Sequence, residues 1–310
     1  MTDYTIRINR VLDYIQEHLD SALTLEELAG IACFSNFHFS RIFSIFTGET
    51  PFQLIQRLRL EKSANLLLHR PDKKIIDIAL SCGFSNTAAF SRAFREYLDC
   101  TPSQWRSSCG KNSNPGIVKS KLSEECFSWQ PYIEYQQGVQ LWRMKKNGQE
   151  RQVEVRSLAA LDCAYIRYVG PYKGDALLFE RLWTRLCAEA GAQELIDNDS
   201  QYLAVYHDNP ELTKDSKLRV TIAVSTSKPF EGSGRLGHLW IPGGKYAIAH
   251  FRLNSSEYQE AWDWLYSQWL PQSGYLPDDR PAFEWFPQEA DQSADGRNTV
   301  RICIPLIAAS

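Results

Sequence analysis

A short pattern that occurs twice in the N-terminal third of the chain is the strongest constraint on its fold. Residues 34–43 read Phe-Ser-Asn-Phe-His-Phe-Ser-Arg-Ile-Phe, and residues 84–94 read Phe-Ser-Asn-Thr-Ala-Ala-Phe-Ser-Arg-Ala-Phe. The residues upstream repeat as well, since Leu28-Ala29 before Cys33 corresponds to Ile78-Ala79 before Gly83. Repeated helical patterns separated by a tight turn indicate two copies of one helix-turn-helix unit.

Local signals place the helix ends of each unit. Thr24 with Glu27 three residues later forms a capping box, and Ser35 and Ser85 are expected to cap the second helices. Gly83 suits a turn with positive φ, a conformation that is less comfortable for Cys33. A helix over about 52–69 joins the two units, so residues 1–106 are predicted to form an all-α tandem helix-turn-helix domain.

The second helix of each unit has one apolar face and one polar face. Phe39 and Phe43 lie four residues apart and face the core, as do Phe90 and Phe94. The outward positions carry no acidic residue, which is what a helix that enters a DNA groove requires. These candidate DNA-binding residues are Asn36, Phe37, Ser40, Arg41, Asn86, Thr87, Ala88, Ser91, Arg92 and Arg95. The alternative is a helical bundle that binds no DNA.

Composition limits the other possibilities. The 310-residue chain has a formal net charge of −3, and residues 1–106 hold 12 basic and 12 acidic residues, so affinity for DNA depends on where charges lie. Its eight cysteines show no metal-binding spacing, and we expect no metal and no cofactor. Neither a signal peptide nor an apolar run long enough to span a bilayer is present, so we expect a cytoplasmic protein without membrane contact.

The C-terminal part contains a second repeat. Residues 107–150 form a connector, rich in turn residues and then in aromatic ones, whose structure the sequence leaves open. In residues 151–310, Trp183 and Trp264 are 81 positions apart, as are Tyr165 and Tyr246. Each half reads strand, helix, strand, strand: 153–168, 175–190, 202–206 and 218–224, then 246–251, 256–270, 282–286 and 299–305. The prediction is an α+β domain of duplicated β-α-β-β units, an antiparallel sheet with two helices on one face and aromatic residues lining the opposite, concave face.

One carboxylate stands out in this domain. Glu284 lies between Phe283 and Trp285, whereas the equivalent position in the first half is Ala204. An acid on an aromatic face is costly unless it meets a cation, which suits binding of lipophilic cations. The candidate ligand-binding residues are Glu284, Tyr165, Tyr168, Tyr206, Trp240, Tyr246 and Trp285. The alternative is a surface glutamate paired with Arg280 or Arg301.

Residues 6–106 resemble the DNA-binding domain of the AraC/XylS family of bacterial transcription regulators. The matching segments are Leu-Glu-Glu-Leu-Ala at 25–29, Phe-Ser-Arg-Ile-Phe at 39–43, Gly-Glu-Thr-Pro at 48–51, and the stretch from 75 that ends Thr-Pro-Ser-Gln-Trp-Arg at 106. The resemblance implies a seven-helix reader that places both recognition helices in successive major grooves of double-stranded DNA. It assigns base contacts to Phe37, Ser40, Arg41, Thr87, Ala88, Ser91 and Arg92. Thr87 and Ala88 are smaller than the residues that relatives often carry, which predicts weaker reading by the second helix.

Residues 151–310 resemble the GyrI-like family, which includes effector-binding domains of multidrug-sensing regulators. The motifs are Val153-Glu-Val-Arg, Ala164-Tyr-Ile-Arg-Tyr-Val-Gly-Pro-Tyr, Ile241-Pro-Gly-Gly-Lys-Tyr and Phe283-Glu-Trp-Phe-Pro. The resemblance implies a small-molecule effector and a ligand-binding role for Glu284.

Together the two resemblances predict a ligand-responsive transcription regulator, a monomer that contacts RNA polymerase. The alternatives are a C-terminal protein-interaction module, or a small-molecule hydrolase in which a pocket glutamate activates water. No Ser/His/Asp or Cys/His arrangement supports catalysis, so we expect no enzyme.

Overall fold

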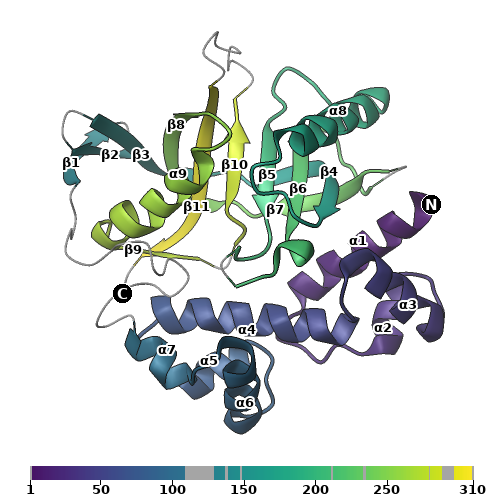
Figure 1. The fold of residues 1–310 in the computed structure, drawn as a ribbon. Helices are drawn as coiled ribbons and strands as arrows, with labels where there is room; N and C mark the ends of the chain where they lie inside the picture. Colours follow the sequence, from purple (N-terminus) through teal and green to yellow (C-terminus); the bar gives the residue numbers. More distant parts are fainter. Residues whose placement is uncertain are drawn as a thin grey trace. The chain divides into compact units, whose positions relative to one another are not determined.

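The computed structural model describes residues 2–108, 129–136, 139–146, 149–210, 212–232, 235–278, 280–287 and 297–308. The chain divides into two compact units (Figure 1). The helical unit comprises Met1–Ser123 together with two short segments, Val169–Pro171 and Asp208–Arg219. The sheet unit comprises Glu124–Tyr168, Tyr172–His207 and Val220–Ser310.

The helical unit contains two helix-turn-helix motifs, as the internal repeat predicted. Its helices are α1 (Thr2–Glu17), α2 (Leu25–Ile31), α3 (Asn36–Thr47), α4 (Pro51–His69), α5 (Ile75–Ser81), α6 (Thr87–Leu98) and α7 (Pro102–Ser108). Helices α2 and α3 form the first motif, α5 and α6 form the second, and α4 joins them.

Capping side chains set several of these helix ends. The predicted capping box of Thr24 and Glu27 starts α2, and Thr50 with Gln53 forms a second box at the start of α4. The prediction that Ser85 caps α6 is wrong, because Asn86 is the N-cap residue and its Oδ1 accepts from the Ala89 backbone N–H at 2.8 Å. Asn86 is the last residue with an extended backbone (φ −161°, ψ 161°) before α6, so the helix begins one residue later than predicted.

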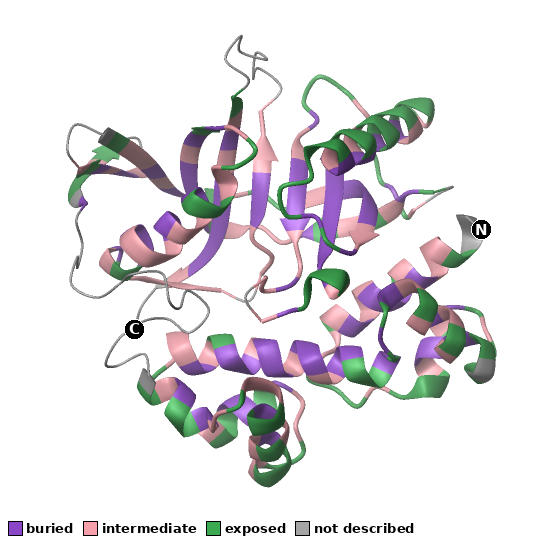
Figure 2. Ribbon diagram, in the orientation of Figure 1, coloured by how far each residue is buried: buried purple, intermediate pink, exposed green. Residues whose placement is uncertain are grey.

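Each helix-turn-helix motif has its own small core. Phe39 and Phe43 are fully buried in a cluster with residues of α1, α2 and α4, while Phe90 and Phe94 are fully buried in a second cluster with α4, α5 and Trp105. Figure 2 shows the buried residues concentrated along the inner sides of these helices. The four phenylalanines therefore fix which face of α3 and of α6 points outward.

Both helix-turn-helix turns contain a residue in the left-handed conformation. Gly83 has φ 82°, and Cys33 holds the left-handed conformation with φ 52°. A Cβ atom at Gly83 would lie 2.5 Å from the Leu19 carbonyl oxygen and 2.8 Å from the Arg59 side chain. The Arg59 guanidinium donates hydrogen bonds to the carbonyls of Leu19 and Ser21, so it has little freedom to move away.

The sheet unit is built on one antiparallel sheet. Its strands are β1 (Gln130–Gln136), β2 (Val139–Lys146), β3 (Gln149–Leu158), β4 (Leu161–Val169), β5 (Tyr202–Tyr206), β6 (Arg219–Ser225), β7 (Gly237–Ile241), β8 (Gly244–Leu253), β9 (Tyr275–Pro277), β10 (Phe283–Phe286) and β11 (Asn298–Ala308). The strand order is β1-β2-β3-β8-β11-β10-β5-β6-β4-β7, with β9 paired to β11.

This topology refines the predicted strands. The single strand expected over 153–168 is wrong, since β3 and β4 are separate strands that pair with different neighbours. Within the connector, which the sequence left open, β1 and β2 extend the sheet beside β3. Along the chain, β4 is followed by α8 (Ala176–Ala192), β5 and β6, whereas β8 is followed by α9 (Tyr258–Trp264), β9, β10 and β11.

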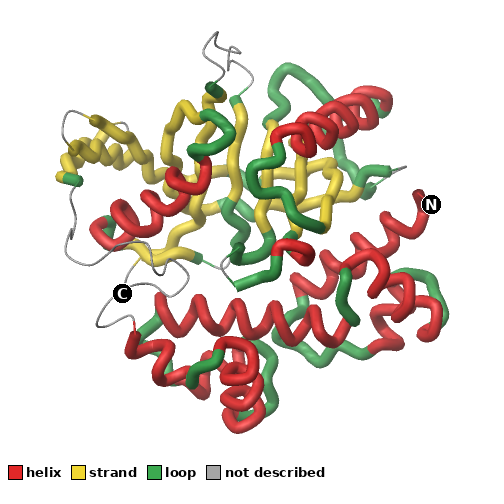
Figure 3. Tube along the Cα trace, in the orientation of Figure 1, coloured by secondary structure: helices red, strands yellow, loops and turns green. Residues whose placement is uncertain are grey.

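Helices α8 and α9 lie against the sheet of this unit (Figure 3), and the two faces of the sheet carry different side chains. On one face, Ile302 and its neighbours pack against Trp264 and Leu265 at the end of α9. Trp183 of α8 lies 5.5 Å from Phe286, ring to ring, on this same face. The opposite face holds a second cluster that includes Tyr165, Tyr246, Phe283 and Cys303. Both helices therefore lie on one face of the sheet, which we call the helix face.

The crowding around Gly83 predicts that alanine at this position and alanine at Gly30 change the free energy of unfolding in opposite directions. We expect Gly83→Ala to lower the free energy of unfolding by more than about 2 kcal/mol, because the new Cβ clashes in a left-handed backbone. Gly30→Ala is the matched control, since nothing lies within 4 Å of its added Cβ and it sits in α2. Gly30→Ala should raise the free energy of unfolding by up to about 1 kcal/mol. Urea unfolding measures both, and equal midpoints would contradict the steric assignment.

Candidate functional site

The predicted DNA-facing residues lie on the outer faces of α3 and α6. Asn36 and Arg41 are exposed on α3, and Ser40 is half-buried between them. The side chain of Phe37 lies outside the described residues. On α6, Ala88, Arg92 and Arg95 are exposed, while Thr87 and Ser91 are half-buried. Burial of the phenylalanines on the inner sides explains this arrangement, and the contact of these faces with bases stays a prediction.

Asn86 has a structural task that the sequence did not reveal. Its Oδ1 accepts from the backbone of Ala89, and its Nδ2 donates to the Ser85 hydroxyl at 3.3 Å. The amide is therefore engaged in starting α6, which leaves the two arginines of this helix, Arg92 and Arg95, as its cationic groups on the exposed face.

Glu284 occupies the helix face near the middle of the sheet. In the pairing of β10 with its two neighbours, Glu284 is opposite Ala204 of β5 and Ile302 of β11. Directly paired residues of an antiparallel sheet share one face, and Ile302 packs against α9. The expectation that this carboxylate belongs to the face without helices is therefore wrong.

Two neutral donors hold the buried carboxylate. The Trp262 indole Nε1 donates to Glu284 Oε1 at 2.8 Å, and the Tyr206 hydroxyl donates to Oε2 at 2.9 Å. Glu284 is only 2% exposed, and no basic side chain in the described part of the chain forms an ion pair with it. The alternative of a surface glutamate paired with Arg280 or Arg301 is therefore excluded.

Burial changes the acidity of this group. Removal from water raises the pKa of Glu284 to about 7, although the hydrogen bonds from Trp262 and Tyr206 favour the ionised form. The same burial, reinforced by the adjacent carboxylate, raises the pKa of Tyr206 well above its ordinary value. The site therefore holds an acid whose charge changes near neutral pH and whose nearest partners carry no positive charge.

Aromatic rings surround Glu284 on the helix face. Tyr206 lies 6.0 Å from Trp262 and 5.6 Å from Tyr172, ring centre to ring centre. Trp262 stacks on Tyr266 at 6.2 Å, and burial together with the charge of Glu284 raises the pKa of Tyr258. We call Tyr172, Tyr206, Tyr258, Trp262 and Tyr266 the aromatic shell. Of these, all but Tyr172 are half-buried, so the rings retain some exposed surface beside a fully buried acid.

The structure separates the aromatic residues that the sequence grouped with Glu284. Tyr206 belongs to the aromatic shell. Tyr165 and Tyr246 are buried in the cluster on the opposite face, and Trp285 lies there too, with the Arg301 guanidinium 4.5 Å above its ring. Alternation along the strands is the reason, since Trp285 must point away from the face that Glu284 occupies.

Two further predicted residues are not part of the aromatic shell. Trp240 is 51% exposed on β7, which ends the strand order of the sheet. Tyr168 lies half-buried near the end of β4.

Most residues of the aromatic shell were not among the ligand-binding residues predicted from the sequence. Tyr258, Trp262 and Tyr266 recur at spacing four, which places them on one side of the α9 region. This stripe is adjacent to the core stripe of Ala261, Leu265 and Trp269, and it was detectable from periodicity alone. That it faces Glu284 follows only from the packing of α9 on the sheet.

The described residues contain no group of three or more His, Cys, Asp or Glu side chains that could hold a metal ion. Across the same residues, none of the helices has the length and apolar character needed to cross a membrane.

Comparison with known proteins matches both parts of the chain. Residues 151–307 match the family described as GyrI-like small molecule binding domain, and residues 28–108 match a helix-turn-helix domain. A protein named DNA gyrase inhibitor from Edwardsiella piscicida is 32% identical over 163 residues, covering 50% of this chain and 97% of that protein. Its namesake from Yersinia enterocolitica is 38% identical over 135 residues, covering 42% of this chain and 82% of that protein.

The N-terminal part is similar to regulators. The regulatory protein PocR from Salmonella typhimurium is 32% identical over 114 residues, which cover 37% of this chain and 37% of that protein.

The raised pKa of Glu284 predicts how stability depends on pH. Because the folded-state pKa of about 7 exceeds the ordinary value of 4.5, the folded protein binds this proton more tightly than the unfolded chain. The stabilisation is complete below pH 4.5 and is lost as the pH rises through 7, and we expect it to amount to about 3 kcal/mol. When the free energy of unfolding in urea is measured at pH 5 and at pH 8, Glu284→Gln should lack the part of the difference that comes from Glu284.

Glu180→Gln is the matched control, since Glu180 is an exposed acid on α8. It should keep the pH dependence of the unchanged protein. If Glu284→Gln and the unchanged protein lose stability in parallel between the two pH values, the assignment of the perturbed acid is wrong.

Proposed function

The chain belongs to the GyrI-like family and is an AraC-type DNA-binding transcription regulator, and from this premise we propose that its C-terminal domain senses a lipophilic cation held at Glu284. The observation that carries the proposal is a carboxylate, 2% exposed, whose hydrogen-bond partners are the neutral Trp262 and Tyr206. An ionised acid removed from water is costly without a counter-charge. A bound cation supplies that charge.

The aromatic shell suits the rest of such a ligand. Indole and phenol rings attract a cation through their negative faces, with Trp the most effective, and they also bury apolar surface. Trp262 and Tyr206 combine both roles, since each presents a ring and a polar atom that already points at the carboxylate. An anionic ligand would instead meet repulsion from Glu284, so the site favours cations with large apolar groups.

The DNA-binding role rests on the outer faces of α3 and α6. We propose that Arg41, Ser40 and Phe37 read bases from α3, and that Thr87, Ala88, Ser91 and Arg92 lie against DNA on α6. Asn36, Asn86 and Arg95 are proposed to position the helices on the phosphate backbone. Two recognition helices on one chain can enter two successive major grooves, so we propose that the protein binds DNA as a monomer. We also propose that it acts beside RNA polymerase in the cytoplasm.

The proposed domains follow the sequence repeats. They are a reader over 1–106, a connector over 107–150 and a sensor over 151–310 built from two duplicated β-α-β-β units. The helix of each unit contributes to the helix face, through α8 and α9.

A second candidate function is a protein-interaction role for the sheet unit. Two of its relatives carry the name DNA gyrase inhibitor, which describes action on a protein. Strand β1 ends the strand order, and its Tyr132 and Tyr135 are 60% and 76% exposed, so they form an apolar edge that a protein could cover. A sheet unit that ignores lipophilic cations would favour this candidate.

Binding of tetraphenylphosphonium tests the ligand proposal. We expect it to quench tryptophan fluorescence, with affinity at least about tenfold weaker in Glu284→Gln because the counter-charge is lost. Affinity for the unchanged protein should fall by up to about tenfold for each pH unit below 7, as the carboxylate becomes protonated. Glu180→Gln should bind like the unchanged protein. Equal affinities across all three proteins would refute the role of Glu284, and turnover of ester substrates would indicate a hydrolase.

Substitution of Arg41 tests the DNA proposal. In Arg41→Ala we expect affinity for a duplex selected by the intact protein to fall by about 1–3 kcal/mol, and affinity for random DNA to change much less. Arg10→Ala is the matched control, since Arg10 is an exposed arginine of α1. Equal losses on selected and random duplexes would mean that Arg41 contacts phosphate and does not read bases.

A further inference from the structure

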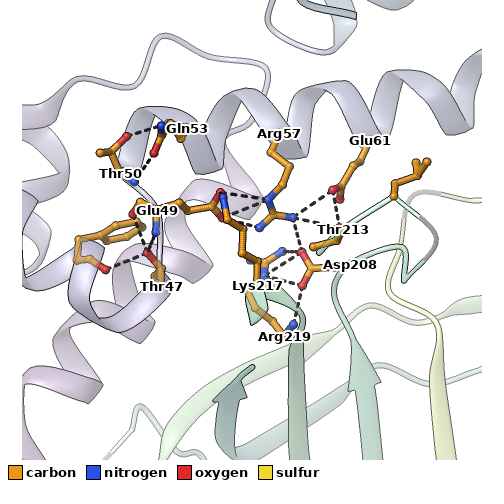
Figure 4. A network of polar contacts seen from close by, with 12 residues as sticks. Thr47, Glu49, Thr50, Gln53, Arg57, Glu61, Asp208, Thr213, Lys217 and Arg219 are labelled. Carbon is orange, nitrogen blue, oxygen red and sulfur yellow. Dashed lines mark hydrogen bonds and ion pairs between the residues drawn. The ribbon is translucent and has the colours of Figure 1, made fainter. Parts of the chain in front are cut away.

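A loop of the C-terminal part of the chain is incorporated into the helical unit. Asp208–Arg219 follows β5 in the sequence and belongs by its contacts to the same compact unit as the helices. Figure 4 shows its polar side chains meeting those of α4 and the turn before it. We call Asp208–Arg219 the docked segment.

The centre of this contact is the buried guanidinium of Arg57 on α4. Its Nη1 lies 2.9 Å from Asp208 Oδ1 and 3.2 Å from Glu61 Oε1, and its Nη2 lies 2.7 Å from Glu49 Oε1. All four side chains are less than a tenth exposed. Burial lowers the pKa of Arg57, but these three acids outweigh that effect and raise it, so the cation stays charged.

The docked segment contributes three further polar groups. Thr213 Oγ1 donates to Glu61 at 2.5 Å, and Lys217 Nζ donates to Glu49 at 2.8 Å. Arg219 pairs with Asp208 at 2.8 Å, which together with Arg57 holds the pKa of Asp208 at about 2 although burial alone would raise it. Three basic and three acidic side chains therefore balance one another in this network.

The same network reaches both recognition helices. Glu49 lies in the turn directly after α3, where its backbone N–H donates to Thr47, the last residue of that helix. At the other end, the Tyr97 hydroxyl of α6 donates to Glu61 at 3.0 Å. The docked segment thus contacts acids that also anchor the ends of α3 and α6.

The docked segment starts close in sequence to the proposed ligand site. Tyr206, the last residue of β5, donates a hydrogen bond to Glu284, and only His207 separates it from Asp208. One residue of extended chain spans about 3.5 Å, so a displacement of Tyr206 cannot be absorbed by slack before Asp208. A cation bound beside the carboxylate draws on the charge of the same oxygen, Glu284 Oε2, that accepts the hydrogen bond from Tyr206, and so weakens that hydrogen bond.

We propose that the docked segment couples the occupancy of Glu284 to the two recognition helices, through Tyr206, Asp208 and Arg57. The inference rests on the proposed function for the nature of the ligand. The route from Tyr206 through Asp208 to Arg57 does not depend on which ligand binds. Buried ion networks have few intermediate arrangements, because a single displaced partner leaves an unpaired buried charge. Loss of the Tyr206 anchor therefore loosens the segment as a whole.

The first experiment needs no ligand. Hydrogen–deuterium exchange of the full chain is compared for the unchanged protein, Tyr206→Phe and Tyr202→Phe. Both tyrosines are half-buried on the same face of β5, but only Tyr206 has a hydrogen bond to Glu284 in the described structure. We expect exchange in peptides covering 208–219 to rise at least about fivefold in Tyr206→Phe and to stay unchanged in Tyr202→Phe. Equal exchange in the three proteins would overturn the inference.

The second experiment measures the coupling itself. Affinity for a duplex selected from random DNA is determined with and without saturating tetraphenylphosphonium. We expect the probe to change the affinity of the unchanged protein by at least about fivefold. In Lys217→Met, the ratio of the DNA affinities with and without the probe should move towards one. In Lys214→Met the ratio should be that of the unchanged protein, because Lys214 is exposed on the same segment. A ratio that is the same in both variants would refute the route through the docked segment.

The two experiments separate the inference from the proposed function. A probe that leaves tryptophan fluorescence unchanged contradicts the proposed ligand class, and the exchange experiment still decides the inference. A probe that binds without altering DNA affinity leaves the ligand site intact and overturns the coupling.

Discussion

The buried Arg57 guanidinium imposes a condition that several distant parts of the chain meet together. A charge removed from water needs acceptors on all sides, and one helix cannot supply them. Glu61 comes from the same helix, Glu49 from the turn after α3, and Asp208 from a loop about 150 positions later in the chain. Because each acid is itself held by a second donor, the cation fixes the ends of two recognition helices and the docked segment at once.

Glu284 presents the opposite electrostatic situation. The Arg57 network balances its buried charges, whereas in the described part of the chain the Glu284 carboxylate accepts hydrogen bonds from the neutral side chains of Trp262 and Tyr206. In the first arrangement Arg219 and Arg57 hold the pKa of Asp208 at about 2, and in the second burial raises the pKa of Glu284 to about 7. A network whose buried charges are paired with opposite charges suits a permanent structural contact. A buried acid without a cationic partner suits the binding of a cationic ligand.

The two halves of the chain differ in how much their sequence revealed. In the helical unit, periodicity and capping residues predicted the repeated motifs, the long joining helix and the outward faces, because these depend on contacts within a few residues or across one turn. In the sheet unit, the alternation of β10 correctly separated Glu284 from Phe283 and Trp285. It could not assign the helix face, since either side of a strand satisfies the same alternation.

The sequence by itself determined that α3 and α6 are amphipathic helices whose phenylalanines face inward, and that one acid interrupts an aromatic strand. Only the tertiary structure decided that Glu284 faces α9, that Tyr165 and Tyr246 lie on the other side of the sheet, and that Asp208 reaches Arg57. The reason is physical: helix periodicity and capping act over neighbouring residues, whereas strand pairing and buried ion contacts join residues whose separation in the chain carries no local pattern.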